Sequence, residues 1–252
     1  MVYFIGAGPG AVDLITVRGM ELLKKADVVI YAGSLVNPEL LQYTKGDCKI
    51  YNSAAMTLEE VIQVFVEAYS PEKTLVRLHT GDPSLYGAIK EQMDLLDEHG
   101  IPYSVVPGVS SFCGAAAVLN AEFTLPGVSQ TVILSRMEGR TPVPAEEDLE
   151  MLASHKASMA LFLSSAMLEP LSQKLIRGGY APGTPAAIVY KATWPDQKII
   201  RTTLEALPQS AAENHITKTA LILVGGFLSS DYERSKLYDS SFSHEFRQAK
   251  TS

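Results

Sequence analysis

The chain has few of the residues that carry metal or nucleophilic chemistry. It contains only two cysteines, Cys48 and Cys113, and five histidines among 252 residues. Neither set shows the short spacing typical of metal ligands, and two cysteines do not make the framework of a small disulfide-rich domain. We therefore expect no metal site. Because no Ser-His-Asp or Cys-His arrangement is supported by the sequence, no catalytic residue is assigned.

Long apolar runs and an excess of basic residues are also missing. The apolar stretches at 159–163 and 220–224 are far shorter than the roughly 20 residues that span a bilayer. The net charge of −7 differs from the basic character of nucleic-acid-binding domains. An expected strand beginning at Val2 leaves no room for a signal peptide. We expect a cytoplasmic protein that binds neither membranes nor nucleic acids.

What the sequence does contain is a regular alternation of strand and helix patterns. Short apolar runs predict buried strands at 2–5, 28–31, 75–78 and 103–106. Helical spacing of apolar residues predicts helices at 16–26, 58–69, 83–98 and 111–119. This alternation indicates a mostly parallel sheet with helices on both faces.

The pattern changes after about residue 120. Strands are expected at 131–134, 159–163, 186–190, 198–203 and 221–224, and helices at 146–154 and 168–177. The strands at 186–190 and 198–203, which flank a loop, look like an antiparallel excursion. We therefore predict an α/β fold with two domains, residues 1–120 with a mostly parallel sheet and 121–228 with a smaller mixed sheet. Residues 229–252 form a polar tail, interpreted either as a disordered end or as an arm that packs on a partner.

A glycine-rich loop, Gly6-Ala7-Gly8-Pro9-Gly10-Ala11, follows the first strand. It matches the G-x-G-x-x-A fingerprint of dinucleotide-binding folds, so a nicotinamide-dependent oxidoreductase is one interpretation. However, the helical pattern begins only at Thr16, and the second strand ends at Tyr31-Ala32-Gly33-Ser34 without an acid to hold a ribose. These features disfavour a phosphate cradle. The glycines instead favour close approach of the backbone to an uncharged part of a ligand, with a plain wide turn as the alternative.

Two further loops follow strands of the same expected sheet. The segment 79–87 reads HTGDPSLYG, in which Asp82 suits a helix N-cap and Pro83 a first helical position. The segment 107–111 reads PGVSS and precedes a helix rich in small residues. Because ligands of open α/β sheets bind at the carboxyl ends of the strands, the three loops together predict one binding rim. For His79, a hydrogen-bonded structural role is favoured over that of a proton carrier.

The second half contributes three basic residues in loops that leave strands: Arg136, Arg140 and Lys191. In most proteins such residues are solvated surface charges. Clustered at strand ends, they could instead pair with carboxylates, for which the planar fork of arginine is well suited.

The strand with GAGPG, then GDPSLYG, then PGVSS, in this order and spacing, closely resembles the tetrapyrrole methylase family over nearly the whole chain. The resemblance implies two α/β domains with S-adenosylmethionine bound in a cleft between them, a tetrapyrrole substrate and a homodimer. Carried over by motif position, it implies cofactor contacts at Pro9, Thr80, Gly81, Asp82, Leu85, Ser110, Ser111, Leu163 and Ala192. Four of these depart from the commonest family residues: Ser110 and Ser111 stand where a Thr-Ala pair is common, Leu163 where methionine is common, and Ala192 where glycine is.

Other segments point to a subgroup within that family. TGDPSLYGAIKEQM, QTVILSRMEGRTPVP and VYKATWPDQKIIRTT resemble the members that methylate carbon 11 of a corrin precursor in cobalamin biosynthesis. The resemblance does not decide whether the substrate carries cobalt. Three alternatives stay open: a sister methylase acting at another ring carbon, a nicotinamide-dependent oxidoreductase, and a non-catalytic binding module.

Overall fold

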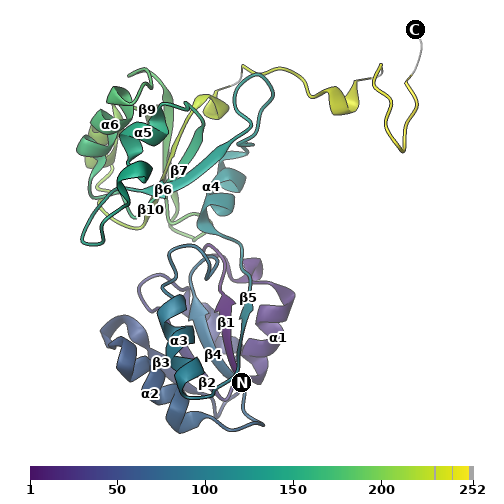
Figure 1. Ribbon diagram of the computed structural model, residues 1–252, viewed down its shortest axis with the longest axis vertical. Helices are drawn as coiled ribbons and strands as arrows, with labels where there is room; N and C mark the ends of the chain where they lie inside the picture. The colour runs from purple at the N-terminus through teal and green to yellow at the C-terminus, as the bar shows by residue number, and fades with distance from the viewer. Residues whose placement is uncertain (230, 240, 250–252) are drawn as a thin grey trace. The chain divides into compact units, whose positions relative to one another are not determined.

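The computed structural model in Figure 1 describes residues 1–229, 231–239 and 241–249. These residues form two compact units. The first comprises Met1–Val118 together with Lys191–Gln197, and the second the rest of the described chain from Leu119 onward. The chain was expected to divide into continuous stretches at about residue 120. The segment Lys191–Gln197 departs from that division, because its side chains pack on the glycine loop near the start of the chain.

The first unit is built on a parallel sheet of five strands in the order β3-β2-β4-β1-β5. The strands are β1 (Val2–Gly6), β2 (Val28–Tyr31), β3 (Lys49–Asn52), β4 (Leu75–His79) and β5 (Tyr103–Val106). Since β1 pairs in parallel with both β4 and β5, the carboxyl ends of these three strands lie at one edge of the sheet. This edge carries all three loops identified above.

Four helices belong to this part of the chain: α1 (Val17–Lys25), α2 (Leu58–Ala68), α3 (Lys90–Glu98) and α4 (Ser111–Leu119). Helix α1 starts where the Thr16 side chain accepts a hydrogen bond from the Gly19 N–H, and α2 starts at a capping box of Thr57 and Glu60. Figure 1 shows α1 on one side of the sheet and α2 and α3 on the other. Separate apolar clusters fill the two interfaces.

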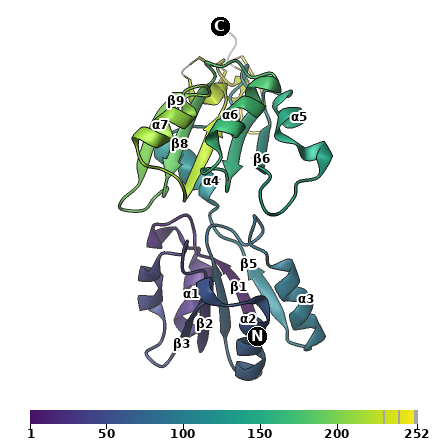
Figure 2. The same ribbon diagram turned by 90° about the vertical axis from the view of Figure 1, so that its left-hand side faces the viewer.

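The second unit contains a mixed sheet in the order β6-β7-β10-β8-β9. Its strands are β6 (Val132–Arg136), β7 (Ser158–Phe162), β8 (Pro185–Tyr190), β9 (Lys198–Thr203) and β10 (Ala220–Val224). Only β6 and β7 pair in parallel; the other three pairings are antiparallel. One apolar cluster joins the sheet to α5 (Leu149–Ala153), α6 (Leu168–Arg177) and α7 (Leu207–Glu213), which cover one face (Figure 2).

The predicted fold class is therefore confirmed, and three elements differ from the prediction. The helix expected at 83–98 begins only at Lys90, because Tyr86 and Ala88 adopt left-handed backbone angles that interrupt a helix. Strand β3 and helix α7 were not predicted; β3 is mostly exposed and carries little apolar pattern. In the part of the chain that the structure describes, no helix is long and apolar enough to cross a membrane.

The tail is mostly exposed over 231–239 and 241–249. A short 3-10 helix lies at Lys236–Tyr238. The backbone N–H of Glu233 donates to the carbonyl of Pro126, which ties the start of the tail to the second unit.

Candidate functional site

The three loops after β1, β4 and β5 are joined through backbone hydrogen bonds. Gly8 and Gly81 form an isolated antiparallel bridge, in which the Gly81 N–H donates to the Gly8 carbonyl at 2.8 Å and the Gly8 N–H donates back at 3.3 Å. The Ala7 N–H donates to the His79 carbonyl at 2.7 Å. Both bridge glycines have positive φ, +81° at Gly8 and +59° at Gly81, a conformation that side chains with a Cβ rarely adopt.

Three glycines make this convergence sterically possible. A Cβ on Gly6 would lie 2.5 Å from both the Cα of Gly108 and the carbonyl oxygen of Gly81. A Cβ on Gly108 would lie 2.1 Å from the same oxygen. The backbones of the three loops are thus in van der Waals contact, so no other residue fits at Gly6 or Gly108 without moving a loop.

The Asp82 carboxylate ties two of these loops together. One of its oxygens accepts hydrogen bonds from the backbone and the hydroxyl of Ser84, at 2.8 and 2.5 Å, and the other accepts from the Gly108 N–H at 2.9 Å. Partial burial alone would raise the pKa of Asp82, but these hydrogen bonds outweigh it and lower the pKa below its ordinary value. The ionised Asp82 side chain therefore links the loops after β4 and β5 through hydrogen bonds, and it does not cap a helix.

The segment Lys191–Gln197 packs on the glycine loop. The indole N–H of Trp194 donates to the Pro9 carbonyl at 3.1 Å, and a Cβ on Gly10 would lie 2.1 Å from the Trp194 ring. The Thr193 hydroxyl accepts from the Ala11 N–H at 3.0 Å. These contacts were missed at the sequence level, because they join positions more than 180 residues apart. The available signal was Trp194 itself, the single tryptophan of the chain, in a loop with Pro195.

Eight of the nine residues expected to contact a cofactor lie in the first unit. Pro9, Gly81, Ser110 and Ala192 are buried, and Thr80, Asp82, Leu85 and Ser111 are half-buried. The buried Pro9 ring packs against Gly114, where a Cβ would come within 2.8 Å of it. The first unit thus brings together the glycine loop, the loop after β4 and the start of α4, as the loop pattern predicted.

The ninth residue, Leu163, lies at the end of β7 in the second unit. It has a positive φ of 51°, and 64% of its surface is exposed. The next residue, Ser164, is buried; its hydroxyl accepts from the Met137 N–H at 2.9 Å and donates to the Phe162 carbonyl at 2.6 Å. The loops after the parallel strands β6 and β7 are joined by this serine, which leaves Leu163 facing outward.

The three basic residues do not form one cluster within a unit. Arg136 donates to three carbonyls of its own loop, those of Met137, Thr141 and Pro142, at 3.0–3.1 Å. Arg140 is exposed on the same loop. Lys191 belongs to the first unit, where its ammonium pairs with Asp196 at 2.6 Å and lies 5.2 Å from the centre of the Trp194 ring.

The chemistry available at the loops is that of shape and backbone polarity. Among the described residues, no group of three or more His, Cys, Asp or Glu side chains is placed to hold a metal ion. His79 is buried, and both burial and the nearby Arg77 lower its pKa to about 3, so the ring is neutral at physiological pH. The loops offer close backbone approach and one fixed carboxylate, an arrangement suited to holding an uncharged part of a ligand.

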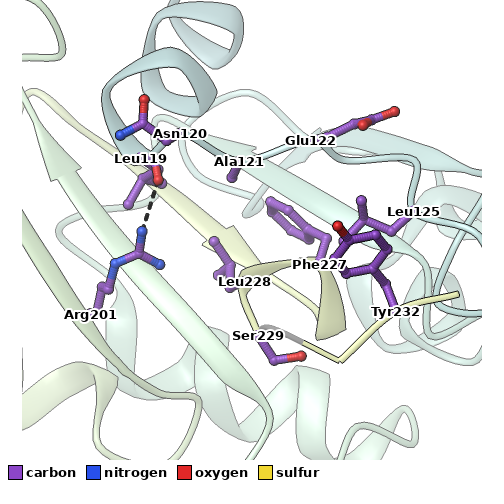
Figure 3. A pocket seen from close by; sticks show the side chains of 10 residues that line it. All are labelled: Leu119, Asn120, Ala121, Glu122, Leu125, Arg201, Phe227, Leu228, Ser229 and Tyr232. Atoms are coloured by element: carbon purple, nitrogen blue, oxygen red, sulfur yellow. Dashed lines mark hydrogen bonds between the residues drawn. The ribbon is translucent and has the colours of Figure 1, made fainter. Parts of the chain in front are cut away.

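A hollow in the second unit differs from this site. It has a volume of about 320 Å³ and lies beside Leu119, Arg201, Phe227 and Tyr232 (Figure 3). Arg201 directs its guanidinium to the Leu119 carbonyl, at 2.8 Å, and so supports the end of α4.

Comparison with known proteins assigns the fold to a family. The family model described as tetrapyrrole (corrin/porphyrin) methylases matches residues 1–208. A protein of Methanocaldococcus jannaschii named cobalt-precorrin-4 C(11)-methyltransferase is 53% identical over 249 residues, which cover 98% of this chain and 96% of that one.

Solved structures agree with this result. The X-ray structure of a cobalamin biosynthetic enzyme, cobalt precorrin-4 methyltransferase, is 49% identical, with a TM-score of 0.88 and coverage of 90% of this chain and 95% of that chain. A uroporphyrin-III C-methyltransferase from Thermus thermophilus, complexed with S-adenosylhomocysteine, is 26% identical, with a TM-score of 0.76 and coverage of 92% and 95%. On these grounds, together with its fold and its loops, the chain belongs to the tetrapyrrole methylase family.

Proposed function

We propose that this methyltransferase moves the methyl group of S-adenosylmethionine to carbon 11 of cobalt-precorrin-4 in cobalamin biosynthesis. The observation that carries this proposal is the 53% identity, over nearly the full length of both chains, with a relative named for that reaction. The printed name of the solved structure with 49% identity agrees with it. The methyl donor is supported by the family and by the relative that binds S-adenosylhomocysteine.

The cofactor contacts are proposed at Pro9, Thr80, Gly81, Asp82, Leu85, Ser110, Ser111, Leu163 and Ala192. The geometry of the first unit supports most of this set, because the glycines, which have no Cβ, bring the three loops into close contact at the carboxyl edge of the sheet, where ligands of such sheets bind. Pro9 is proposed both to contact the cofactor and to anchor the glycine loop. Its buried ring against Gly114 and its carbonyl under Trp194 make it the fixed point of the glycine loop.

The bound sulfonium supplies an electrophilic methyl group, and the residues of this chain supply alignment. Loops held together by the Gly8–Gly81 bridge and the hydrogen bonds of Asp82 lose little entropy when a ligand binds. Alignment of bound reactants lowers a barrier by up to about 7–11 kcal/mol, whereas a general base contributes about 10²–10⁴-fold. A site made of rigid loops, without an evident acid–base pair, is suited to a direct displacement of this kind.

For the substrate carboxylates, we propose a division of labour among Arg136, Arg140 and Lys191. Arg136 already donates to three carbonyls of its loop, so it acts as a positioning residue that shapes the segment carrying Arg140. Arg140, exposed on that segment, is the direct contact. Lys191 acts from the Trp194 loop, where its pair with Asp196 fixes the ammonium.

We further propose a cytoplasmic homodimer; the dimer is tested by measuring the mass of the protein in solution.

The deciding experiment incubates the enzyme with labelled S-adenosylmethionine and precorrin-4, with and without cobalt, and analyses the product by mass spectrometry and NMR. We expect one methyl group on carbon 11, with the cobalt-bearing substrate preferred. A methyl group on another ring carbon would instead assign the chain to a sister methylase. Binding of S-adenosylhomocysteine without turnover of either substrate would refute the proposed activity.

A further inference from the structure

A cavity of about 300 Å³ lies within the first unit, on the face of the sheet that α2 and α3 cover. Its lining includes Thr80 and Leu85 of the loop after β4 together with Arg77, His79 and Gln92. Ligand pockets begin at about this size, and a single water needs only about 10–15 Å³. The cavity is thus large enough for a side chain of a ligand and lies against the loop that bears two of the proposed cofactor contacts.

Arg77 is a buried cation that forms no ion pair with any described residue, although the exposed Glu91 also lines the cavity. It is only 7% exposed, at the centre of the sheet on β4. Its guanidinium donates to the Gln92 side chain at 3.0 Å and to the Ile30 carbonyl at 3.3 Å, both neutral acceptors. Burial lowers the pKa of Arg77 to about 10, so the group stays protonated at neutral pH. Buried charges in proteins are normally paired, because an isolated charge in an apolar interior is costly.

His79 stands two positions further along the same strand, so its side chain leaves the same face of the sheet. It is 5% exposed, and its Nε2 has no hydrogen-bond partner although the atom is buried. Its ring lies 6.1 Å from the ring of Phe4. A buried polar atom left without a partner costs about 1–3 kcal/mol, so an orphaned nitrogen beside a cavity points to a missing ligand.

From these observations, we infer that the cavity beside Arg77 and His79 binds a carboxylate of the tetrapyrrole substrate. A carboxylate oxygen accepts from Nε2–H of His79, and the negative charge neutralises the Arg77 guanidinium, which would satisfy both groups at once. The Nε–H of Arg77 donates to the Oε1 of Gln92, and the Nε2 of Gln92 in turn donates to the Ala88 carbonyl at 2.9 Å. The pair is therefore pre-organised before the ligand arrives.

The position of the cavity identifies the source of the carboxylate. Thr80 and Leu85 line it and also belong to the proposed set of cofactor contacts, so an acid side chain held there lies beside the methyl donor. This step rests on the proposed function. A free small carboxylic acid has the same chemistry, and the experiment must separate the two sources.

The test uses the full-length enzyme and three variants: His79→Phe, Arg77→Lys and, as a control, Arg18→Met on the exposed surface of α1. His79→Phe removes the nitrogen donor and keeps the ring, and Arg77→Lys keeps the charge but loses the fork that Gln92 holds. We expect each of the two pocket variants to raise the KM for cobalt-precorrin-4 by about tenfold or more, as for loss of a hydrogen bond to a charged group. The affinity for S-adenosylhomocysteine and the kinetics of Arg18→Met should change less than about twofold, within the usual effect of surface substitutions.

A second readout does not depend on turnover. In protein labelled with ¹⁵N-histidine, addition of substrate should shift the His79 ring signals, and propionate should do the same at high concentration while neutral propionamide should not. A shift with substrate but not with propionate also supports the inference, because it assigns the carboxylate to the intact tetrapyrrole. The inference would be overturned if the folded pocket variants kept the KM of wild type, or if they lost cofactor binding as much as substrate binding. It would also be overturned if the His79 signals did not respond to substrate and responded alike to propionate and propionamide. If wild type fails to methylate any precorrin yet its His79 signals respond to propionate, the pocket stands and the proposed function falls.

Discussion

Replacement of Gly108 with alanine tests the convergence of the three loops. The new Cβ would lie 2.1 Å from the Gly81 carbonyl oxygen and 2.7 Å from the Cα of Gly6, whereas real Cβ atoms essentially never come closer than 3.0 Å. The loop after β5 must therefore retreat by at least 0.9 Å, the difference between 3.0 and 2.1 Å. Both obstructing atoms are backbone, so no side-chain rotation relieves the overlap.

Overpacking of this kind costs about 1–3 kcal/mol, and the retreat also weakens the hydrogen bond from the Gly108 N–H to Asp82, worth about 0.5–1.5 kcal/mol or more. We expect a total of about 2–4 kcal/mol, which corresponds to binding of S-adenosylhomocysteine weaker by about 30- to 1,000-fold when the loss falls on the liganded loops. Titration calorimetry measures the affinity, and thermal unfolding measures any part of the loss that appears as stability.

The matched control is Gly46→Ala, since a Cβ at Gly46 meets no atom within 4 Å and this glycine has no positive φ. Its affinity and melting temperature should stay close to those of wild type. A Gly108→Ala protein that binds S-adenosylhomocysteine as wild type does and melts at the same temperature would refute the reasoning.

Three further predictions concern side chains around the same loops. In wild type, the pKa of the folded Asp82 carboxyl lies below its ordinary value of 3.8, so the stability that the carboxylate contributes is present above pH 3.8 and is lost as the pH falls through the folded pKa. Urea unfolding of wild type and Asp82→Asn should therefore show a difference in the free energy of unfolding that becomes smaller in acid. A difference that does not change with pH would contradict this. For His79, burial and the nearby Arg77 hold the pKa in the folded protein at about 3, whereas the ordinary pKa of histidine is 6.5. Wild type should therefore lose up to about 1.4 kcal/mol of stability for each pH unit below 6.5, and His79→Phe should not show this loss. Parallel slopes for the two proteins between about pH 7 and 5 would show that the ring is not held neutral. Trp194→Phe removes the hydrogen bond to the Pro9 carbonyl, which is worth about 0.5–1.5 kcal/mol, and should weaken S-adenosylhomocysteine binding about 2- to 10-fold. An unchanged affinity would mean that the segment Lys191–Gln197 does not support the glycine loop.

The expected effects differ in kind, and that difference separates the roles. Gly108 and Trp194 act on the packing of the loops that carry the proposed cofactor contacts, so their variants should change cofactor binding first. Arg77 and His79 act on the cavity beside it, so their variants should change the KM for the tetrapyrrole and leave cofactor binding alone. A variant that disturbs both measurements equally would have altered the unit as a whole.

The sequence by itself determined the architecture of the chain and the place of its loops. Short apolar runs such as Val28–Tyr31 and Ala220–Val224 are typical of buried strands, and the helical spacing of apolar residues at Leu58–Ala68 predicts α2 where the structure has it. The strand–loop motifs also carried the family resemblance, which the family model and the relatives confirm. These features depend on residues close together in the chain, which is why they can be read from it directly.

Local pattern failed where a backbone departed from its usual preference. The helix expected from Pro83 is interrupted because Tyr86 and Ala88 adopt a left-handed backbone conformation, which neither residue type favours and the sequence therefore does not predict. Asp82 was expected to cap that helix, and it instead accepts from Gly108 in a loop 26 residues away. The choice between the two partners depends on the parallel pairing of β4 and β5 with β1, which brings their carboxyl ends together.

Only the tertiary structure decided which distant groups meet. It placed Trp194 on Pro9 and Gly10, joined Gly8 to Gly81, and left the buried Nε2 of His79 without a partner beside Arg77. Composition and residue spacing do not predict these contacts, because each contact forms between two segments that are far apart in the chain and that only the fold brings together. The glycine loop could be recognised from its letters, but its rigidity comes from the segments that close on it.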